Sequence, residues 1–286
     1  MGGDPPLVSI VTPSLNQGRF LGDAIRSVLD QDYAPLEYLV VDGGSTDASL
    51  DVLRSYEGRI TWHSAADEGQ AAAIARGFAE TRGEILAWLN ADDVYEKGAV
   101  ARAVAFMRER TDVALAYGDA VFVDHDGRTL GRCEHVEPFD RDRLLNHKLI
   151  VAQPSAFFRR DAFEAVGGLD KSLRWTLDYD LWLRLSERFV AAHIEAVLAR
   201  VRIHPGSKTS TGGLQRLLEV EDVVRRHGRR RLPRSFYREM WAARRQALAA
   251  SWRAGRYGAA LRHGRLGADY WAAWAIDRLY ARSFRA

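Results

Sequence analysis

The stretch Ile85–Asp93, with the sequence ILAWLNADD, decides the fold of this 286-residue chain. Its apolar part has the length and composition of a buried strand, and it ends in two adjacent carboxylates. Open α/β sheets bind ligands at the carboxyl ends of their strands, where Asp92 and Asp93 would lie. Two such groups suit a hard divalent cation that bridges a diphosphate. The alternative is a helix N-cap, in which either carboxylate accepts from amides of a helix that begins near Glu96.

This strand is the last of four that alternate with helices. We predict strands over residues 8–12, 36–41, 60–63 and 84–89, and helices over 20–29, 48–56 and 70–81. The alternation predicts an α/β fold with a doubly wound, mostly parallel sheet flanked by helices. Further along, we predict helices over 98–108 and 179–189, and strands over 113–117, 120–123, 153–158 and 196–203. A polar loop over 204–213 follows.

Composition excludes several classes of protein. No segment approaches 18 uncharged apolar residues, so no transmembrane span is expected. The first six residues lack the basic and apolar regions of a signal peptide. The single cysteine, Cys133, excludes an internal disulfide and a cysteine-based zinc site. A cytoplasmic location is the resulting expectation.

Charge divides the chain into two parts. Residues 214–286 contain 17 arginines, no lysine and six acids, a net charge of +11, whereas residues 1–213 carry 24 basic and 32 acidic residues, a net −8. We therefore expect one acidic domain over 1–213 and a basic, Arg- and Trp-rich helical extension over 214–286. Such asymmetry indicates that the two parts meet different partners.

A third acidic residue, Asp42, directly follows the second strand at the same sheet edge. A carboxylate there can accept from a ribose hydroxyl or a base imide. The glycine-rich signature of a dinucleotide site is missing, because Pro13 to Asn16 follows the first strand, and there is no Walker sequence. A turn with a helix cap is the competing interpretation of Asp42. Gln70, at the start of an alanine-rich helix, could face phosphate or base, with ordinary capping as its alternative.

A second acidic centre lies around residues 175–184. Asp178 and Asp180 open a predicted helix, next to Trp175 and Trp182. A carboxylate in such a partly apolar setting can act as a general base, and aromatic side chains with polar ends are common in sugar sites. A helix start with tryptophan packing is the competing interpretation.

The loop after the last predicted strand contains two further candidate site residues. His204 gains interest because Asp92 and Asp93 already suggest a cation, and neutral imidazole is a common ligand of transition metals such as manganese. Lys208 could neutralise a phosphate leaving group.

In this order, the motifs resemble those of the inverting glycosyltransferases of family 2, which have the GT-A fold. The resemblance covers residues 7–210 and rests on VSIVTP at 8–13, VVDGGSTD at 40–47, WLNADD at 88–93, GGLD at 167–170 and LDYDLW at 177–182.

The resemblance implies roles for individual residues. Those that would hold the nucleotide are Thr12, Pro13, Asn16, Asp42 and Gln70. Residues 90–92 occupy the place of the family's Asp-x-Asp motif, so Asp92 would contact Mn²⁺ or Mg²⁺, with Asp93 as a second ligand or a loop-fixing group. Asn90 stands where the family has Asp, which leaves a hydrogen-bonding group for ribose.

By the same resemblance, Asp178 would be the catalytic base and Asp180 an orienting group. Independently of the resemblance, Trp175 and Lys208 are candidates for contact with the acceptor or the diphosphate. The implied reaction moves a sugar from a nucleotide diphosphate, with UDP favoured, to an acceptor hydroxyl in cell-surface glycan assembly. Two alternatives stay open. A nucleotidyltransferase would need a glycine- and arginine-rich phosphate loop, which residues 13–19 do not supply, and a nucleotide-sugar-binding scaffold would bind without turnover.

The basic extension lies outside the resemblance. Its four tryptophans are at positions 241, 252, 271 and 274. A basic helix with tryptophan can lie in an anionic membrane interface, which would place the protein at the inner face of a membrane near a lipid-linked acceptor. The alternative is a helical appendage that packs on the catalytic domain or dimerises; glycines at 255, 258, 264 and 267 favour a bundle of short helices. No nucleic-acid-reading motif is present, so no nucleic-acid partner is expected, and the oligomeric state stays open.

Overall fold

The computed structural model describes residues 4–146, 150–228 and 232–283. The chain divides into two compact units, the first made of residues 1–141 and 149–205 and the second of 142–148 and 206–286. The second unit thus resumes at residue 206, inside the polar loop 204–213. This is before residue 214, where the basic part of the sequence begins. It also takes most of the short helix α5 (Arg141–Leu145) from the middle of the chain.

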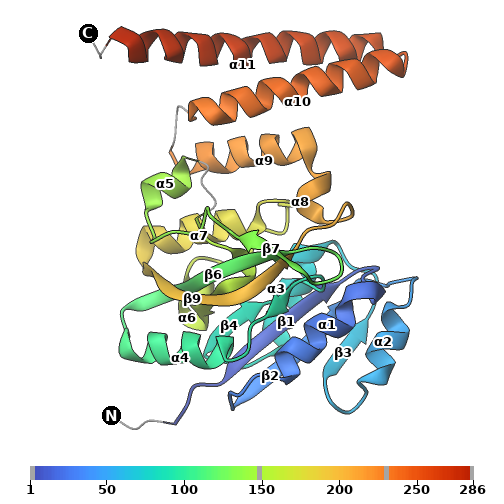
Figure 1. Ribbon diagram of the computed structural model, residues 1–286, viewed down its shortest axis with the longest axis vertical. Helices are drawn as coiled ribbons and strands as arrows, with labels where there is room; N and C mark the ends of the chain where they lie inside the picture. The colour runs from blue at the N-terminus through green and yellow to red at the C-terminus, as the bar shows by residue number, and fades with distance from the viewer. Residues whose placement is uncertain (1–3, 147–149, 229–231, 284–286) are drawn as a thin grey trace. The chain divides into compact units, whose positions relative to one another are not determined.

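Within the described residues, the first unit contains one sheet in the order β3-β2-β1-β4-β8-β6-β9-β5, with β7 paired to β6 (Figure 1). Its first four strands run parallel. They are β1 (Val8–Ser14), β2 (Leu36–Asp42), β3 (Thr61–Ser64) and β4 (Ile85–Trp88). This part confirms the doubly wound, parallel sheet that the alternation predicts.

The rest of the sheet is mixed. Its strands are β5 (Val94–Tyr95), β6 (Val113–Val123), β7 (Thr129–Arg132), β8 (Ala156–Arg159) and β9 (Val190–Arg202). β8 lies antiparallel between β4 and β6, whereas β9 runs parallel to β6 and antiparallel to β5. The long β9 therefore carries the chain to the same edge at which the parallel strands end.

One strand stands where the sequence predicts two. Residues 113–117 and 120–123 belong to a single strand, β6, whose pairing with β9 shifts at Gly118. A Cβ on Gly118 would lie 2.4 Å from Leu198 Cγ and 2.6 Å from the Ala196 carbonyl oxygen. The glycine therefore marks a close approach of two strands rather than a break between them.

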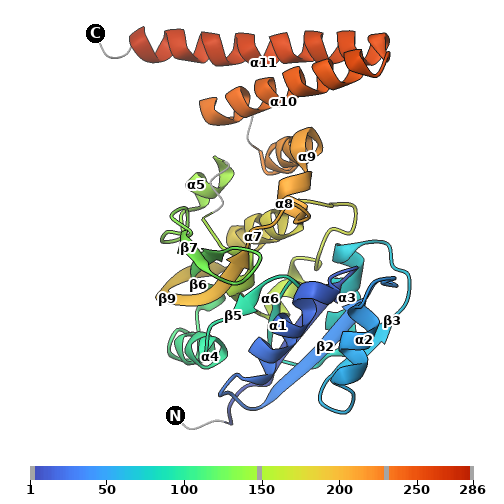
Figure 2. The ribbon, with the colours of Figure 1, turned by 45° about the vertical axis from the view of Figure 1, so that its right-hand side comes forward.

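Helices cover both faces of the sheet (Figures 1 and 2). They are α1 (Gly18–Leu29), α2 (Ser49–Ser55), α3 (Gln70–Glu80), α4 (Ala99–Glu109), α6 (Arg160–Ala165) and α7 (Leu177–Arg188). Helix α4 begins at Ala99, after the Gly98 cap and strand β5. The helix-cap interpretation of Asp92 and Asp93 is therefore wrong.

The two faces have different cores. On one face, apolar residues of α1, α2 and α4 pack against strands β1, β2 and β4. On the other, Trp88 of β4 stacks on Trp182 of α7 with ring centroids 5.6 Å apart and an interplanar angle of 16°. Phe78 of α3 and Phe158 of β8 pack edge-on around the pair. Trp182 is thus a core residue. This agrees with the alternative interpretation of residues 175–184, in which the tryptophan packs in the core.

The second unit is helical. Its further elements are α8 (Lys208–Thr211), α9 (Gly213–Arg226), α10 (Arg234–Arg253) and α11 (Tyr257–Ser283). Helices α10 and α11 lie side by side as an antiparallel hairpin (Figure 1). Gly255, with a φ of +69°, ends α10, as expected for a helix-terminating glycine.

Contrary to expectation, α11 runs through the other three glycines. A Cβ on Gly264 would lie 2.9 Å from Leu248 Cδ1 of α10, and one on Gly267 would lie 3.2 Å from Arg244 Cβ. These two glycines therefore allow the helices of the hairpin to approach closely instead of shortening α11.

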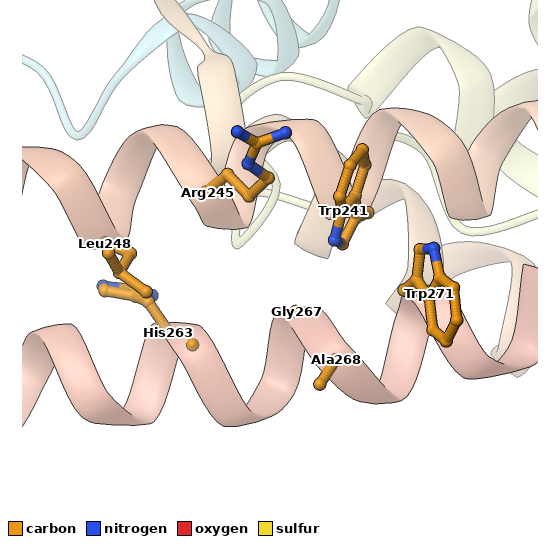
Figure 3. Close-up of a pocket in the computed structure, with 8 residues that line it drawn as sticks. Trp241, Arg245, Leu248, His263, Gly267, Ala268 and Trp271 are labelled. Carbon is orange, nitrogen blue, oxygen red and sulfur yellow. The ribbon is translucent and has the colours of Figure 1, made fainter.

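A pocket of about 270 Å³ opens between α10 and α11. The indoles of Trp241 and Trp271 lie at one end of it, and Leu248 and His263 at the other (Figure 3). The side chain of Trp274 lies outside the described part of the chain. Among the described helices, none is long and apolar enough to cross a membrane.

Helix α3 packs tightly on β1, since a Cβ on Gly77 would lie 2.6 Å from Val11 Cγ1. We expect Gly77→Ala to lower the free energy of unfolding by about 1–3 kcal/mol, because an extra methyl group overpacks this contact. Gly22→Ala is the matched control. A Cβ at that helical position meets nothing nearer than 3.5 Å, so better helix propensity should stabilise by up to about 1 kcal/mol. Urea denaturation of both variants checks this, and a neutral Gly77→Ala would contradict it.

Candidate functional site

The centre of the candidate site is a contact between Asp92 and His204. Asp92 follows β4 and His204 follows β9, and their Oδ2 and Nε2 atoms lie 3.0 Å apart although 112 residues separate them in the chain. Both side chains are mostly buried, with 18% of Asp92 and 10% of His204 exposed. The tilted Phe20 ring packs against the imidazole, with centroids 4.8 Å apart. The fold thus brings together two of the three predicted metal ligands.

Asp93 is hydrogen-bonded to other partners. Its Oδ1 accepts from the Arg202 backbone amide at 3.0 Å, and its Oδ2 accepts from Asn90 Nδ2 at 3.1 Å. Burial raises the pKa of the Asp93 carboxyl well above its ordinary value, and the Asp92 charge raises it further, against the opposing effect of these hydrogen bonds. Asp93 therefore fixes its loop in this structure, which is the second of the two roles considered for it.

Asp92 and His204 offer donor atoms of the kind that a divalent cation would need. Two adjacent ligands of an octahedral ion, each about 2.1 Å from the metal, lie about 3 Å apart, close to the observed distance. A carboxylate oxygen together with an imidazole nitrogen suits Mn²⁺ better than Mg²⁺. In the part of the chain that the structure describes, no group of three or more His, Cys, Asp or Glu side chains is arranged to hold a metal ion.

Asn90 joins α3 to the end of β4. Gln70, the first residue of α3, donates from Nε2 to Asn90 Oδ1 at 2.7 Å. Asn90 Nδ2 in turn donates to Gln153 Oε1 at 2.8 Å, and Gln153 Nε2 donates to the Trp88 carbonyl at 2.8 Å. Two predicted nucleotide contacts therefore lie side by side, in a chain of amides anchored on the strand.

Asp42 is completely buried, and its own surroundings satisfy its carboxylate. Oδ2 accepts from the backbone amides of Gly44 and Ser45 and from the Ser64 hydroxyl, and Oδ1 accepts from the Ser45 hydroxyl. Three donors converge on Oδ2 and one reaches Oδ1, so the surroundings use most of the acceptor capacity of this carboxylate. This geometry favours the turn interpretation of Asp42 over direct contact with a nucleotide.

The other residues predicted at the nucleotide lie at the end of β1. Thr12 is buried and accepts from the Tyr38 hydroxyl at 3.0 Å, and Pro13 is buried beside it in β1. Asn16 has a φ of +53°, and its Oδ1 accepts from the Thr46 amide at 2.8 Å. Asn16 thus ties the loop after β1 to the loop after β2, and both loops lie at the carboxyl edge of the sheet.

Asp178 lies in the first turn of α7 and is half-buried. Its Oδ1 accepts from the Tyr179 amide at 2.8 Å. Residues four apart share a helix face, so Asp178 lies on the same face as Trp182, which stacks on Trp88 of β4. The stack therefore holds the first turn of α7 to the strand that leads into Asp92.

Asp180 is buried and pairs with Arg184, whose Nε lies 2.7 Å from Asp180 Oδ2. The same guanidinium donates from Nη1 to the carbonyls of Val166 and Gly168, both at 2.7 Å. Asp180 thus attaches the start of α7 to the double-glycine turn, an orienting position. Trp175, just before α7, is partly exposed, with the Arg174 guanidinium 5.1 Å above its ring.

Lys208 is the first residue of α8 and belongs to the second unit, so the first unit by itself does not contain it.

Two residues of the site were absent from the sequence-based prediction, Gln153 and Arg202. Nothing in the sequence marks Gln153. Nothing marks Arg202 either, because the partners of its guanidinium lie 77 to 179 residues away in the chain.

The family model described as glycosyl transferase family 2 matches residues 9–167 of the chain. An uncharacterized glycosyltransferase of Rickettsia prowazekii is 29% identical over 230 residues, which are 76% of this chain and 70% of the relative. A PGL/p-HBAD biosynthesis glycosyltransferase of Mycobacterium tuberculosis is 31% identical over 228 residues, which are 77% of this chain and 84% of the relative.

Solved structures show the same fold. TarS of S. aureus, in complex with UDP-GlcNAc, superposes with a TM-score of 0.63 at 14% identity, over 85% of this chain and 72% of that chain. The mannosyltransferase PcManGT of Pyrobaculum calidifontis, in complex with GDP-Man and Mn²⁺, gives 0.62 at 19% identity, over 96% and 88%. The chain is therefore a glycosyltransferase with the GT-A fold, and it belongs to glycosyl transferase family 2.

Proposed function

We propose that the protein transfers a sugar, with inversion, from a nucleotide diphosphate to an acceptor hydroxyl. The contact between Asp92 Oδ2 and His204 Nε2 carries the proposal, because it brings a carboxylate and an imidazole together at the sheet edge where α/β folds bind nucleotides. The neighbouring amides of Gln70 and Asn90 supply hydrogen-bonding groups for ribose or base. A bound Mn²⁺ or Mg²⁺ would offset the negative charge that develops on the departing diphosphate.

Asp178 is the proposed general base. Its carboxylate takes the proton of the acceptor hydroxyl while that oxygen attacks the anomeric carbon from the face opposite the diphosphate. One carbon–oxygen bond forms as the other breaks, so the configuration inverts without a covalent glycosyl-enzyme. The buried pair of Asp180 and Arg184 keeps the first turn of α7 in place during this displacement.

UDP is the nucleotide carrier that the resemblance to family 2 favours. TarS forms a complex with UDP-GlcNAc, whereas the mannosyltransferase forms one with GDP-Man, so both carriers occur with this fold. Because Asp42 is satisfied within its own turn, we assign it to shaping the nucleotide site together with Thr12, Pro13 and Asn16. Lys208 is proposed to neutralise the diphosphate and Trp175 to contact the acceptor.

The proposed acceptor is a glycan or a lipid-linked hydroxyl used in cell-surface glycan assembly, with the enzyme at the cytoplasmic face of a membrane. The second unit supports this location by its chemistry. It exposes Trp252, Tyr257 and Trp271, and its helical part is rich in arginine. Basic helices with exposed tryptophan bind anionic lipid surfaces through both charge and apolar area.

The first prediction from the proposed function concerns the cation and the nucleotide. In thermal denaturation, we expect Mn²⁺ with UDP to stabilise the wild type by about 2.7 kcal/mol at 100 times the dissociation constant. The metal-dependent part should be lost in Asp92→Asn. GDP and other nucleoside diphosphates are the comparison ligands.

Asp119→Asn is the matched control for this experiment. Asp119 Oδ1 also lies 3.0 Å from a histidine Nε2, that of His193, with similar burial, but the Arg132 guanidinium already neutralises it. The metal-dependent stabilisation should survive in Asp119→Asn. Its loss there, or its survival in Asp92→Asn, would place the cation elsewhere.

The second prediction concerns the base. Asp178→Asn should lower kcat by about 10²- to 10⁴-fold while nucleotide affinity stays unchanged, because the amide cannot accept the hydroxyl proton. Asp161→Asn is the control, since Asp161 Oδ1 bonds the next amide at the start of α6 just as Asp178 does in α7. Turnover of a sugar nucleotide and calorimetric binding of its nucleotide are the measurements. Near-normal turnover in Asp178→Asn would remove it from the role, whereas binding without turnover in the wild type would favour the scaffold alternative.

The third prediction concerns the second unit. The full chain should pellet with vesicles that contain phosphatidylglycerol, less so at high salt, and not with neutral phosphatidylcholine vesicles. The double variant Trp252→Ser, Trp271→Ser should pellet less. Leu130→Ser, which removes an equally exposed apolar side chain from the first unit, should pellet like the wild type. Pelleting that ignores lipid charge, or a double variant that pellets fully, contradicts this location.

A further inference from the structure

We propose that Arg202 is a positioning residue that holds Asp92 and His204 in the geometry that binds the cation. The inference rests on the proposed function and extends it to a side chain that does not itself reach the metal pair. Arg202 is the last residue of β9, and only 3% of its side chain is exposed.

The Arg202 guanidinium binds three separate segments of the first unit. Its Nε donates to the Asp92 carbonyl at 3.0 Å. Its Nη1 donates to the carbonyls of Asp124 and His125, at 3.3 and 3.1 Å, in the turn between β6 and β7. Its Nη2 lies 3.1 Å from Asp23 Oδ2 of α1. The main chain that carries the Asp92 carboxylate is therefore tied to α1 and to the turn after β6.

The backbone of the same residue is tied to the loop that carries Asp92. The Arg202 amide donates to Asp93 Oδ1, which joins the end of β9, two residues before His204, to the loop after β4. The Phe20 ring contacts both side chains, with the Arg202 guanidinium carbon 4.9 Å from its centroid and the His204 imidazole centroid 4.8 Å from it. Arg202 and Phe20 together therefore set both the backbone spacing of the ligands and the tilt of the imidazole.

The chemistry of these contacts requires arginine. One planar guanidinium directs its donors along diverging lines to Asp92, Asp23 and the turn carbonyls, which the single ammonium of lysine cannot do. A buried charge is costly unless its hydrogen bonds are made, so a site that needed only packing would be better served by an apolar side chain. Groups that orient metal ligands typically change metal affinity by about 10- to 100-fold when they are mutated.

The test is the affinity for Mn²⁺ of Arg202→Lys, measured by the electron paramagnetic resonance signal of free Mn²⁺ at saturating UDP and, in parallel, GDP. Protein-free titrations correct for the Mn²⁺ that the nucleotide binds. We expect the dissociation constant to rise by about 10- to 100-fold at a temperature where the variant is folded. Phe20→Leu, which keeps an apolar side chain but removes the ring, should raise it by a smaller factor.

Arg160→Lys is the matched control. The Arg160 guanidinium also donates to two carbonyls and a hydroxyl, those of Gly83, Phe78 and Thr81, but at the opposite edge of the sheet. Its Mn²⁺ affinity should equal that of the wild type even if its stability falls. Wild-type affinity in Arg202→Lys, or an equal loss in Arg160→Lys, would overturn the inference. If the wild type bound no Mn²⁺ above Asp92→Asn, the cation of the proposed function would fail instead.

Discussion

The indole of Trp182 lies nearly parallel to that of Trp88 in the core, and this stack joins the two halves of the proposed active site. Trp88 ends β4, four residues before Asp92, and Trp182 lies in α7, four residues after Asp178. Offset stacking of two large aromatic rings is directional as well as apolar, so it sets the angle of the helix on the sheet. The proposed base and the proposed metal ligand thus owe their relative placement to side chains that touch neither substrate.

Burial separates the two adjacent carboxylates into different roles. Asp93 is enclosed and hydrogen-bonded to the backbone of β9 and to Asn90, whereas Asp92 keeps an exposed edge beside His204. The same division holds at α7, where Asp180 is buried against Arg184 and Asp178 stays half-exposed. In each pair, one acid supports the loop or helix from which the other reaches the site.

Much of the site followed from local sequence. The position of Asp92 after an apolar strand, and of Asp178 in the first turn of a helix, could be predicted because hydrophobic periodicity identifies strands and helices. Partners could not. Gln153 and Arg202 reach Asn90 and Asp92 across 63 and 110 residues, and no local pattern encodes which strand will lie beside which. The glycines of α11 were misjudged for the same reason, since their role depends on the approach of α10.

The sequence by itself determined the alternating α/β framework, the acidic residues at its edge and the basic character of the second unit, because these depend on the order of residue types along the chain. Only the tertiary structure decided which of those acids are available. Asp93 accepts from the Arg202 amide, which folding brings to it from the end of β9, whereas Asp92 meets the imidazole of His204, which follows that strand. Whether a carboxylate binds a ligand or holds a loop depends on the donors around it in space, and long-range strand pairing sets those donors.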